Sequence, residues 1–214
     1  EGEQRTSRRC WVVSAEVDNV SIPQAIDMIA TAPRHDAERA RVVHFVHPHA
    51  LNLAVRDVTL AANLRAADAV LPDGSGIRLA GRILGTPLTH NVNGTDLLGP
   101  LCERLVREQT PLVLVGAAPG VAAACASYLI EKFPDLDIPI VSHGFLDDEA
   151  TDRLLSRIAA LGRCVVLVGM GSPIQERWCW QHADVIPSAT LVTVGGLFDF
   201  YSGRIPRASW AWRE

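Results

Sequence analysis

The sequence lacks several features that would place it in common classes of protein. It has no stretch of about 18 apolar residues, so it predicts no membrane-spanning helix, and its polar start lacks the apolar core of a signal peptide. Its five cysteines are widely spaced and form no CxxC pair, which argues against a zinc knuckle and favours a reduced, cytosolic compartment. The net charge of -4 gives no overall attraction to nucleic acid, which we do not expect as a partner.

Several phosphate-binding and catalytic motifs are also missing. The sequence contains no GxGxxG, GxxxxGK[ST] or GxSxG pattern. Their absence argues against a dinucleotide site of the Rossmann type, a P-loop and a hydrolase nucleophile elbow. An unrelated nucleotide-dependent oxidoreductase is therefore the least favoured of three functional alternatives.

Short apolar runs alternate with longer amphipathic stretches along the chain. With 48% apolar and 21% charged residues the composition is that of a globular protein. We predict a Rossmann-like α/β fold, with a mostly parallel sheet and helices on both faces. Predicted strands cover residues 11–13, 41–46, 69–71, 112–115, 138–141, 164–168 and 190–194. Predicted helices begin at Ser21 or cover residues 50–67, 77–84, 95–108, 119–133, 147–161 and 174–185.

The predicted domain organisation is simple. Residues 1–203 are expected to form a single α/β domain, since no linker or low-complexity tract divides them. Residues 204–214 are basic and rich in tryptophan, and we interpret them as the start of a C-terminal appendage. Arginine and tryptophan together favour the surface of an anionic membrane, although these residues could instead pack on the domain.

Glycine-rich loops follow several predicted strands. The loops at residues 116–120 and 169–173 lead into helices that Pro119 and Pro173 are expected to start. Ligands bind beyond the carboxyl ends of parallel strands, and the N-terminus of a helix attracts phosphate. Converging loops of this kind suggest a nucleoside diphosphate. The alternative is that the glycines only make tight turns.

Asp73 is the best candidate for acid–base chemistry. It follows a short strand between Pro72 and Gly74, where a rigid loop would hold its carboxylate over the sheet. Such a carboxylate can take a proton from a sugar hydroxyl, although an Asp there could also act as a local turn residue. His47 and His49 form an HxH pair without an obvious third ligand, so no metal site is predicted. The DLD sequence at residues 135–137 lies at the wrong end of the predicted sheet for a donor site.

Four sequence blocks together resemble a known family. They are AADAVLPDGSG at residues 66–76, NGTDL at 93–97, VGMGSPIQERW at 168–178 and GGLFDFYSG at 195–203. Together they resemble the WecG/TagA/CpsF glycosyltransferases, glycosyltransferase family 26, from about residue 10 to the end.

The resemblance implies an inverting transfer from a UDP-sugar, with an N-acetylmannosamine-type sugar favoured. The acceptor would be a polyprenyl-diphosphate-linked glycolipid used in cell-surface polysaccharide or teichoic acid synthesis. The enzyme would be cytoplasmic and peripheral at the inner face of the cell membrane. It would need no cofactor and no metal, and a homo-oligomer stays open.

The resemblance also assigns roles to single residues. Asp73 would be the catalytic base, and Gln175 would lie near the donor sugar. The nucleotide diphosphate and its base would be contacted by the remaining matched positions, which are Gly116, Pro119, Gly120, Phe145, Gly169, Gly171 and Asp199.

Three positions depart from the family pattern. Many members end the second strand in Thr-x-Asn-Pro, where this chain has Phe45, Val46, His47 and Pro48. Asn91 stands where some members carry an Arg near the active site. His47 and Asn91 remain candidate substrate-binding residues. The departures suggest either another donor, such as a UDP-glucose-type sugar for exopolysaccharide, or a catalytically weakened nucleotide-sugar-binding domain.

Overall fold

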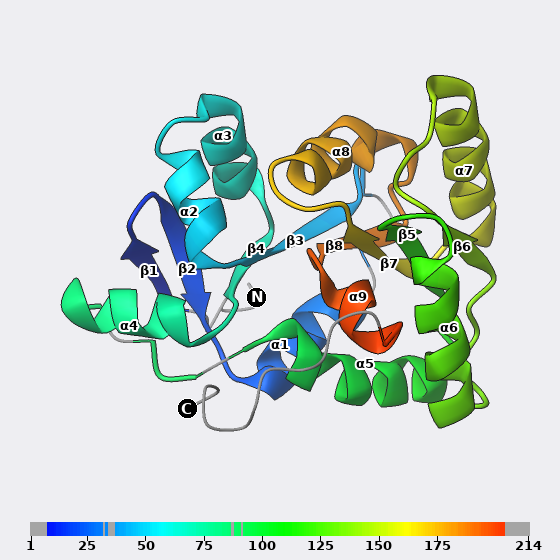
Figure 1. The fold of residues 1–214 in the computed structure, drawn as a ribbon, viewed down its shortest axis with the longest axis horizontal. Helices are drawn as coiled ribbons and strands as arrows, with labels where there is room; N and C mark the ends of the chain where they lie inside the picture. The colour runs from blue at the N-terminus through cyan, green and yellow to red at the C-terminus, as the bar shows by residue number, and fades with distance from the viewer. Residues whose placement is uncertain (1–7, 32, 34–36, 87, 91, 204–214) are drawn as a thin grey trace.

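The sheet that carries the fold has six strands, all parallel (Figure 1). The computed structural model describes residues 8–31, 33, 37–86, 88–90 and 92–203. The sheet order is β4-β3-β8-β7-β5-β6. Its strands are β3 (Arg41–Val46), β4 (Ala69–Pro72), β5 (Leu112–Gly116), β6 (Ile140–Ser142), β7 (Cys164–Gly169) and β8 (Ala189–Thr193).

Helices cover both faces of this sheet, as predicted. They are α1 (Ile22–Ala30), α2 (Pro48–Ala54), α3 (Val58–Ala66), α4 (Ser75–Ile83), α5 (Gly94–Glu108), α6 (Val121–Lys132), α7 (Asp148–Leu161), α8 (Ile174–His182) and α9 (Leu197–Tyr201), with a short 3-10 helix, η1 (Ala183–Val185), after α8. Figure 1 shows α3, α8 and α7 on one side of the sheet and α1 and α5 on the other.

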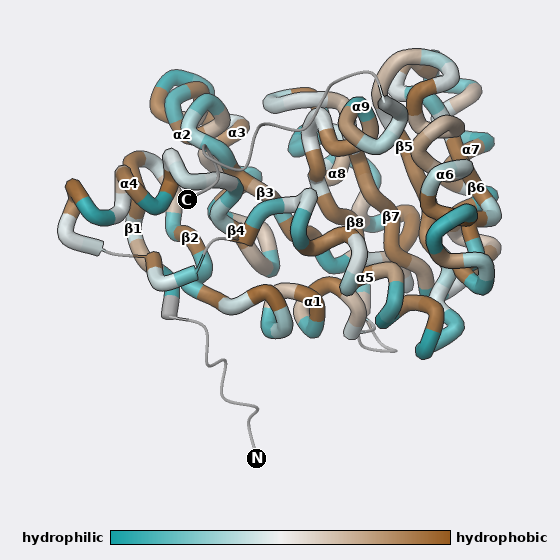
Figure 2. The backbone as a smooth tube through the Cα atoms, turned by 60° about the horizontal axis from the view of Figure 1, so that its bottom comes forward, coloured by the Kyte–Doolittle hydropathy of each residue, from teal (hydrophilic) through white to brown (hydrophobic). Residues whose placement is uncertain are grey.

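Successive strand residues pack alternately on the two faces. Leu112 and Leu114 of β5 belong to a core with α1, α5, α6 and α9, whereas Val113 and Val115 pack with α7 and α8. Such strands are buried on both sides, which explains why they are continuously apolar in the sequence (Figure 2). The Rossmann-like α/β prediction is confirmed.

The predicted first strand exists but does not join the parallel sheet. Residues near Trp11 do form a strand, β1 (Arg8–Val12), but it pairs antiparallel with β2 (Ala15–Asn19) in a separate two-stranded sheet. The buried Asp18 side chain accepts a hydrogen bond from the Val70 N–H at 2.8 Å and ties this hairpin to β4. The sequence of β2 is largely polar, and no strand is predicted there from the pattern of apolar residues.

Several predicted helix boundaries are also wrong. The single helix expected over residues 50–67 is two helices, because the Asp57 carboxylate caps α3 through the Thr59 and Leu60 N–H groups, each at 3.0 Å. The helix predicted to begin at Thr95 begins at Gly94, and Asn93 caps it, since the Asn93 side chain accepts from the Asp96 N–H at 2.8 Å. The helix expected from Pro119 begins two residues later, at Val121.

The helix start predicted at Ser21 is confirmed, since Ser21 and Gln24 form a capping box at the start of α1. Cys164 lies at the start of β7 and Cys179 lies in α8, and both are buried. Burial raises the pKa of the Cys164 thiol to about 11, so it stays protonated as a small apolar group. In the part of the chain that the structure describes, no helix is both long and apolar enough to cross a membrane.

Candidate active site

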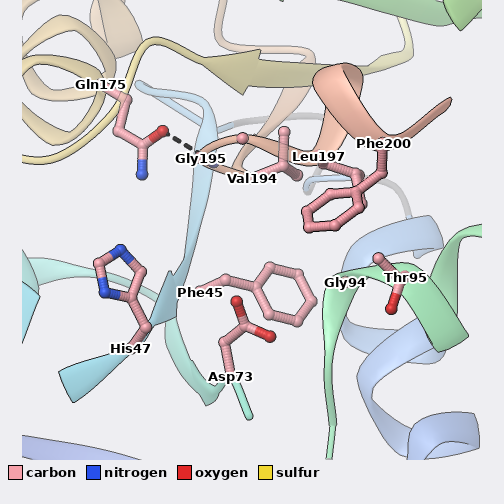
Figure 3. A pocket seen from close by; sticks show the side chains of 11 residues that line it. Phe45, His47, Asp73, Gly94, Thr95, Gln175, Val194, Gly195, Leu197 and Phe200 are labelled. Carbon is pink, nitrogen blue, oxygen red and sulfur yellow. Dashed lines mark hydrogen bonds between the residues drawn. The ribbon is translucent and has the colours of Figure 1, made fainter. Parts of the chain in front are cut away.

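A cavity of about 210 Å³ opens at the carboxyl ends of β3, β4 and β8 (Figure 3). This is the end of a parallel sheet at which ligands bind. Its walls come from segments far apart in the sequence, namely the ends of these strands, the start of α5, the start of α8 and the loop into α9. The residues that line it are Phe45, His47, Asp73, Gly94, Thr95, Gln175, Val194, Gly195, Gly196, Leu197 and Phe200.

Asp73 holds its carboxylate in this cavity directly after β4. Its backbone N–H donates to the Val46 carbonyl at 2.8 Å, which fixes the loop to the neighbouring strand β3. Burial raises the pKa of the Asp73 carboxyl, while the charge of His47 and a hydrogen bond from the Gly94 N–H partly oppose the rise. A carboxylate with a raised pKa is a stronger base than an exposed one, which suits it for taking a proton from a hydroxyl group.

His47 and Phe45 form the wall of the cavity contributed by β3. The His47 ring accepts a hydrogen bond from the Ala50 N–H at 3.4 Å and so caps α2. Its ring stacks on that of His49, with 5.9 Å between the centroids. Phe45 adds an apolar surface close to Asp73 (Figure 3). The Asp73 carboxylate therefore has the apolar Phe45 ring on one side and the His47 imidazole on the other (Figure 3).

The start of α5 forms the wall opposite His47 (Figure 3). Asn93 anchors it, since its Oδ1 accepts from both the Asp96 N–H and the Thr95 hydroxyl. The Tyr201 hydroxyl of α9 donates to the Thr95 carbonyl at 2.8 Å. These bonds hold the Gly94 N–H in place beside Asp73, so the Asp73 carboxylate has a fixed hydrogen-bond partner.

Gln175 closes the top of the cavity as drawn in Figure 3, and its buried side chain takes part in a hydrogen-bond network. Its Oε1 accepts from the Gly195 N–H at 3.0 Å, and its Nε2 donates to Glu176 at 2.9 Å. The same Glu176 oxygen accepts from the Ser172 hydroxyl at 2.7 Å. The network fixes the Gln175 amide and joins α8 to the loop after β8.

The glycine loops form a continuous row along the carboxyl edge of the sheet. The Gly144 N–H after β6 donates to the Ala117 carbonyl after β5 at 3.0 Å, and the Ala117 N–H donates to the Gly169 carbonyl at 2.6 Å. A Cβ on Gly169 would lie 2.9 Å from the Gly195 carbonyl oxygen, so these two loops also touch. Gly195 lines the cavity, and the row therefore runs from β6 to Asp73.

At Gly116 a side chain is excluded because backbone atoms of the neighbouring loop occupy its place. A Cβ on Gly116 would lie 2.2 Å from the Gly169 carbonyl oxygen, and the φ of +144° at Gly116 disfavours any other residue. The helices that follow the row, α6 and α8, have Gly120 and Pro173 as N-cap residues, and neither makes a side-chain capping hydrogen bond. The Val121 N–H of α6 donates to the Ala118 carbonyl and the Gln175 N–H of α8 donates to the Gly171 carbonyl, so only the remaining N–H groups of these first turns can serve a ligand.

The structure brings together only part of the predicted site. Asp73, His47 and Gln175 line one cavity. Gly116 and Gly169 belong to the adjoining loop row, and the predicted positions Pro119, Gly120 and Gly171 lie in the same two loops. Phe145, in the loop after β6, is 75% exposed, and Asp199 lies in the first turn of α9. Asn91 falls outside the described residues.

Other cavity residues were missed as individual sites. Gly94 and Thr95 belong to one block that carries the family resemblance, and residues 195–197 belong to another. The order of helices and strands places each of these segments near the carboxyl edge of the sheet. Only the tertiary packing, in which α5 contacts α1 and α9 contacts α6, brings them to Asp73. Among the described residues, no group of three or more His, Cys, Asp or Glu side chains is arranged to hold a metal ion.

Comparison with known proteins identifies the family. The model of the glycosyl transferase WecG/TagA/CpsF family matches residues 10–214. An N-acetylglucosaminyldiphosphoundecaprenol N-acetyl-beta-D-mannosaminyltransferase of Bacillus spizizenii (strain W23) is 31% identical over 155 residues, which are 72% of this chain and 60% of that protein. An enzyme of the same name from Staphylococcus aureus (strain NCTC 8325) is 24% identical over 212 residues, 99% of this chain and 83% of that protein. The oxidoreductase alternative is thereby excluded, and the chain belongs to the WecG/TagA/CpsF family of glycosyltransferases.

Proposed function

We propose that this chain transfers N-acetylmannosamine from its UDP derivative to N-acetylglucosaminyl-diphosphoundecaprenol, with inversion at the transferred carbon. The names of the related enzymes support this acceptor and this sugar over a UDP-glucose-type donor. The observation that carries the proposal is the Asp73 carboxylate, which faces the cavity and has a pKa raised by burial.

The proposed reaction is a single displacement. A hydroxyl oxygen of the acceptor sugar attacks the anomeric carbon of the donor, and its proton passes to the Asp73 carboxylate. The bond between the anomeric carbon and the diphosphate oxygen breaks, and UDP leaves with the electron pair. Asp73 must lie on the acceptor side of the sugar, since attack and departure occur on opposite faces.

The donor would extend from the cavity along the loop row. At about 210 Å³ the cavity is smaller than the roughly 300–1,000 Å³ of pockets that enclose a drug-sized ligand. It can enclose the transferred sugar beside Gln175, but not the nucleotide as well. The N–H groups at the starts of α6 and α8 would receive the diphosphate and stabilise the charge that develops on it. The exposed Phe145 ring would stack on the uracil, and Asp199 is a second candidate contact for the base.

The departures from the family pattern concern the acceptor side of the cavity. Phe45 and His47 both lie near Asp73, whereas Gln175 and the loop row lie on the proposed donor side. We therefore expect these two changes to affect the proton transfer and the acceptor more than the donor. A catalytically weakened domain would retain UDP binding and fail to transfer.

The test is UDP release measured across a panel of UDP-sugars, with and without a polyprenyl-diphosphate-linked N-acetylglucosamine analogue. We expect release that depends on both UDP-N-acetylmannosamine and the acceptor, and protection of the fold by UDP without added Mg²⁺. UDP protection without transfer from any donor would identify the weakened domain. No protection by UDP would contradict the donor site itself.

The proposed acceptor also implies where the protein works. A polyprenyl chain is buried in a bilayer, so the enzyme has to reach the cytoplasmic surface of the cell membrane. Residues 204–214 contribute Arg204, Arg207 and Arg213 beside Trp210 and Trp212, and we propose that they assist this association.

A further inference from the structure

Helix α4 leaves a stripe of large apolar side chains uncovered. Leu79 is 58% exposed and Ile83 76%, and they lie four residues apart, on the same side of the helix. Leu84, which ends the helix, is 53% exposed. The opposite side is packed, because Ile77 is fully buried and a Cβ on Gly81 would lie 2.7 Å from the Thr86 carbonyl oxygen. The orientation of α4 is thus fixed with its apolar stripe outward.

The neighbouring hairpin carries another exposed apolar side chain. Strand β1 packs against α4, and the Thr86 hydroxyl donates to the Trp11 carbonyl at 3.1 Å. The Trp11 ring is 52% exposed, and its N–H is already bonded to the Val13 carbonyl. Exposed Trp is characteristic of residues that lie at a membrane interface.

The charge on α4 is entirely positive. Arg78 and Arg82 lie on the helix, and no acidic residue occurs in the sequence between Asp73 and Asp96, although the whole chain has a net charge of -4. Within the described part of the chain neither arginine forms a salt bridge. The Nε of Arg78 is buried without a hydrogen-bond partner there. Figure 2 shows the resulting mixture of hydrophobic and hydrophilic residues along α4.

The position of α4 connects this surface to the reaction. The helix begins at Ser75, two residues after Asp73, with only Gly74 between them. If the proposed function holds, the acceptor is a sugar on a diphosphate whose lipid tail stays in the bilayer. The apolar and basic face that α4 carries beyond its start at Ser75 is complementary to that surface in both hydrophobicity and charge.

We propose that the exposed face of α4, formed by Leu79, Arg82, Ile83 and Leu84 with the half-buried Arg78 beside them, docks on the anionic cytoplasmic surface of the membrane. The leucine and isoleucine side chains enter the boundary between headgroups and acyl chains, and the arginines pair with lipid phosphates. Docking in this way presents Asp73 to acceptors at the surface. The inference rests on the proposed function for its biological meaning, but it concerns a different group of residues.

The experiment is co-sedimentation of the full chain with phosphatidylcholine vesicles, with or without phosphatidylglycerol, at low and at high salt. The variant Leu79→Glu/Ile83→Glu reverses the character of the stripe at exposed positions. The control variant Ile130→Glu/Val185→Glu makes the same change of charge at two exposed apolar residues of α6 and η1. We expect the α4 variant to lose at least about tenfold in partition coefficient and the control to bind as the unmodified chain does. Arg82→Gln should lose about fivefold, on anionic vesicles only.

Equal vesicle binding by the α4 variant and the control would overturn the proposal. So would a change in oligomeric state on ultracentrifugation without a change in vesicle binding, because the stripe would then face a second copy of the chain. Transfer to an acceptor analogue with a short, water-soluble lipid should be unaffected by the α4 variant. Vesicle binding needs no substrate, so a chain that binds vesicles through α4 but transfers no sugar would contradict the proposed function alone.

Discussion

Replacing Asp73 by Asn tests the catalytic assignment with little disturbance of the fold. The backbone hydrogen bond from residue 73 to the Val46 carbonyl does not involve the side chain. The amide oxygen of Asn can still accept from the Gly94 N–H, so the loop after β4 should keep its position. What is lost is the ability to take a proton.

The expected loss lies in the upper part of the range for a general base. Removing such a base typically costs about 10²- to 10⁴-fold, which corresponds to about 2.7–5.5 kcal/mol in the barrier. Burial raises the pKa of Asp73 towards the working pH, and this makes the carboxylate a more effective base than an exposed one. Water can also enter the cavity and accept the proton in the variant, so the loss in rate should not exceed this range. We therefore expect about 10³- to 10⁴-fold in kcat.

The pH dependence gives a second measurement on the same variant. In the unmodified chain kcat/KM should fall as the pH drops through the raised pKa of Asp73, because the protonated form cannot act as a base. In Asp73→Asn this acidic limb should be absent from the residual activity. The thermal stability of Asp73→Asn should not fall, in contrast to its activity. A carboxyl whose folded pKa is raised destabilises the fold at pH values above that pKa, so the variant should melt at the same temperature or higher at neutral pH.

The assay is UDP release under saturating donor and acceptor, with Asp135→Asn as a control at an exposed carboxylate in the turn before β6. The thermal shift caused by UDP should be equal in both variants, since Asp73 is assigned to the acceptor. Near-normal turnover by Asp73→Asn would remove Asp73 from the role of base. Loss of UDP protection in that variant would instead show that the change disturbs the donor site.

Three further changes test the surroundings of the base. His47→Asn keeps the cap of α2, because Asn is an effective N-cap, but removes the charge that lowers the pKa of Asp73. The acidic limb of the kcat/KM profile should therefore move to higher pH, and an unmoved limb would contradict the electrostatic effect of His47 on Asp73. Gln175→Leu leaves the Gly195 N–H without its acceptor, so it should lower the free energy of unfolding by about 1–3 kcal/mol and raise the KM for the donor. The control Gln181→Leu, at an exposed position of α8, should change neither quantity. Gly116→Ala places a Cβ 2.2 Å from a backbone oxygen and should abolish the thermal protection by UDP, and protection retained in this variant would exclude that loop from the donor site. The control Gly99→Ala in α5 has open space around it and should stabilise the fold by up to about 1 kcal/mol.

Patterns of apolar residues were enough to predict the sheet and most helices. The strands around Leu112–Gly116 and Cys164–Gly169 are continuously apolar because a parallel sheet covered on both faces buries every side chain. The helix start at Ser21 was predictable because its cap is made by residues within the same turn. Where a structural preference depends on neighbours in the sequence, the sequence alone reveals it.

The errors have two different causes. The break between α2 and α3 follows from a local signal that the prediction missed, because Asp57 caps α3 through the Thr59 and Leu60 N–H groups. The strand β2 has the largely polar sequence AEVDN, and its buried Asp18 accepts a hydrogen bond from the Val70 N–H of β4. This contact, like the ion pair at 2.6 Å between Asp57 and Arg177, 120 positions apart, is a consequence of packing that the sequence does not reveal.

The candidate site divides in the same way. The sequence by itself determined that Asp73 follows a strand and that glycine loops lie at the strand ends, because strand, turn and helix order follow from local preferences and hydrophobic periodicity. Only the tertiary structure decided that α5 brings the Gly94 N–H to Asp73 and that the loop after β8 closes the same cavity. It alone left the stripe on α4 uncovered. Burial, the raised pKa of Asp73 and the exposure of Leu79 and Ile83 depend on which segments meet in space, and that is set by the packing of the whole chain.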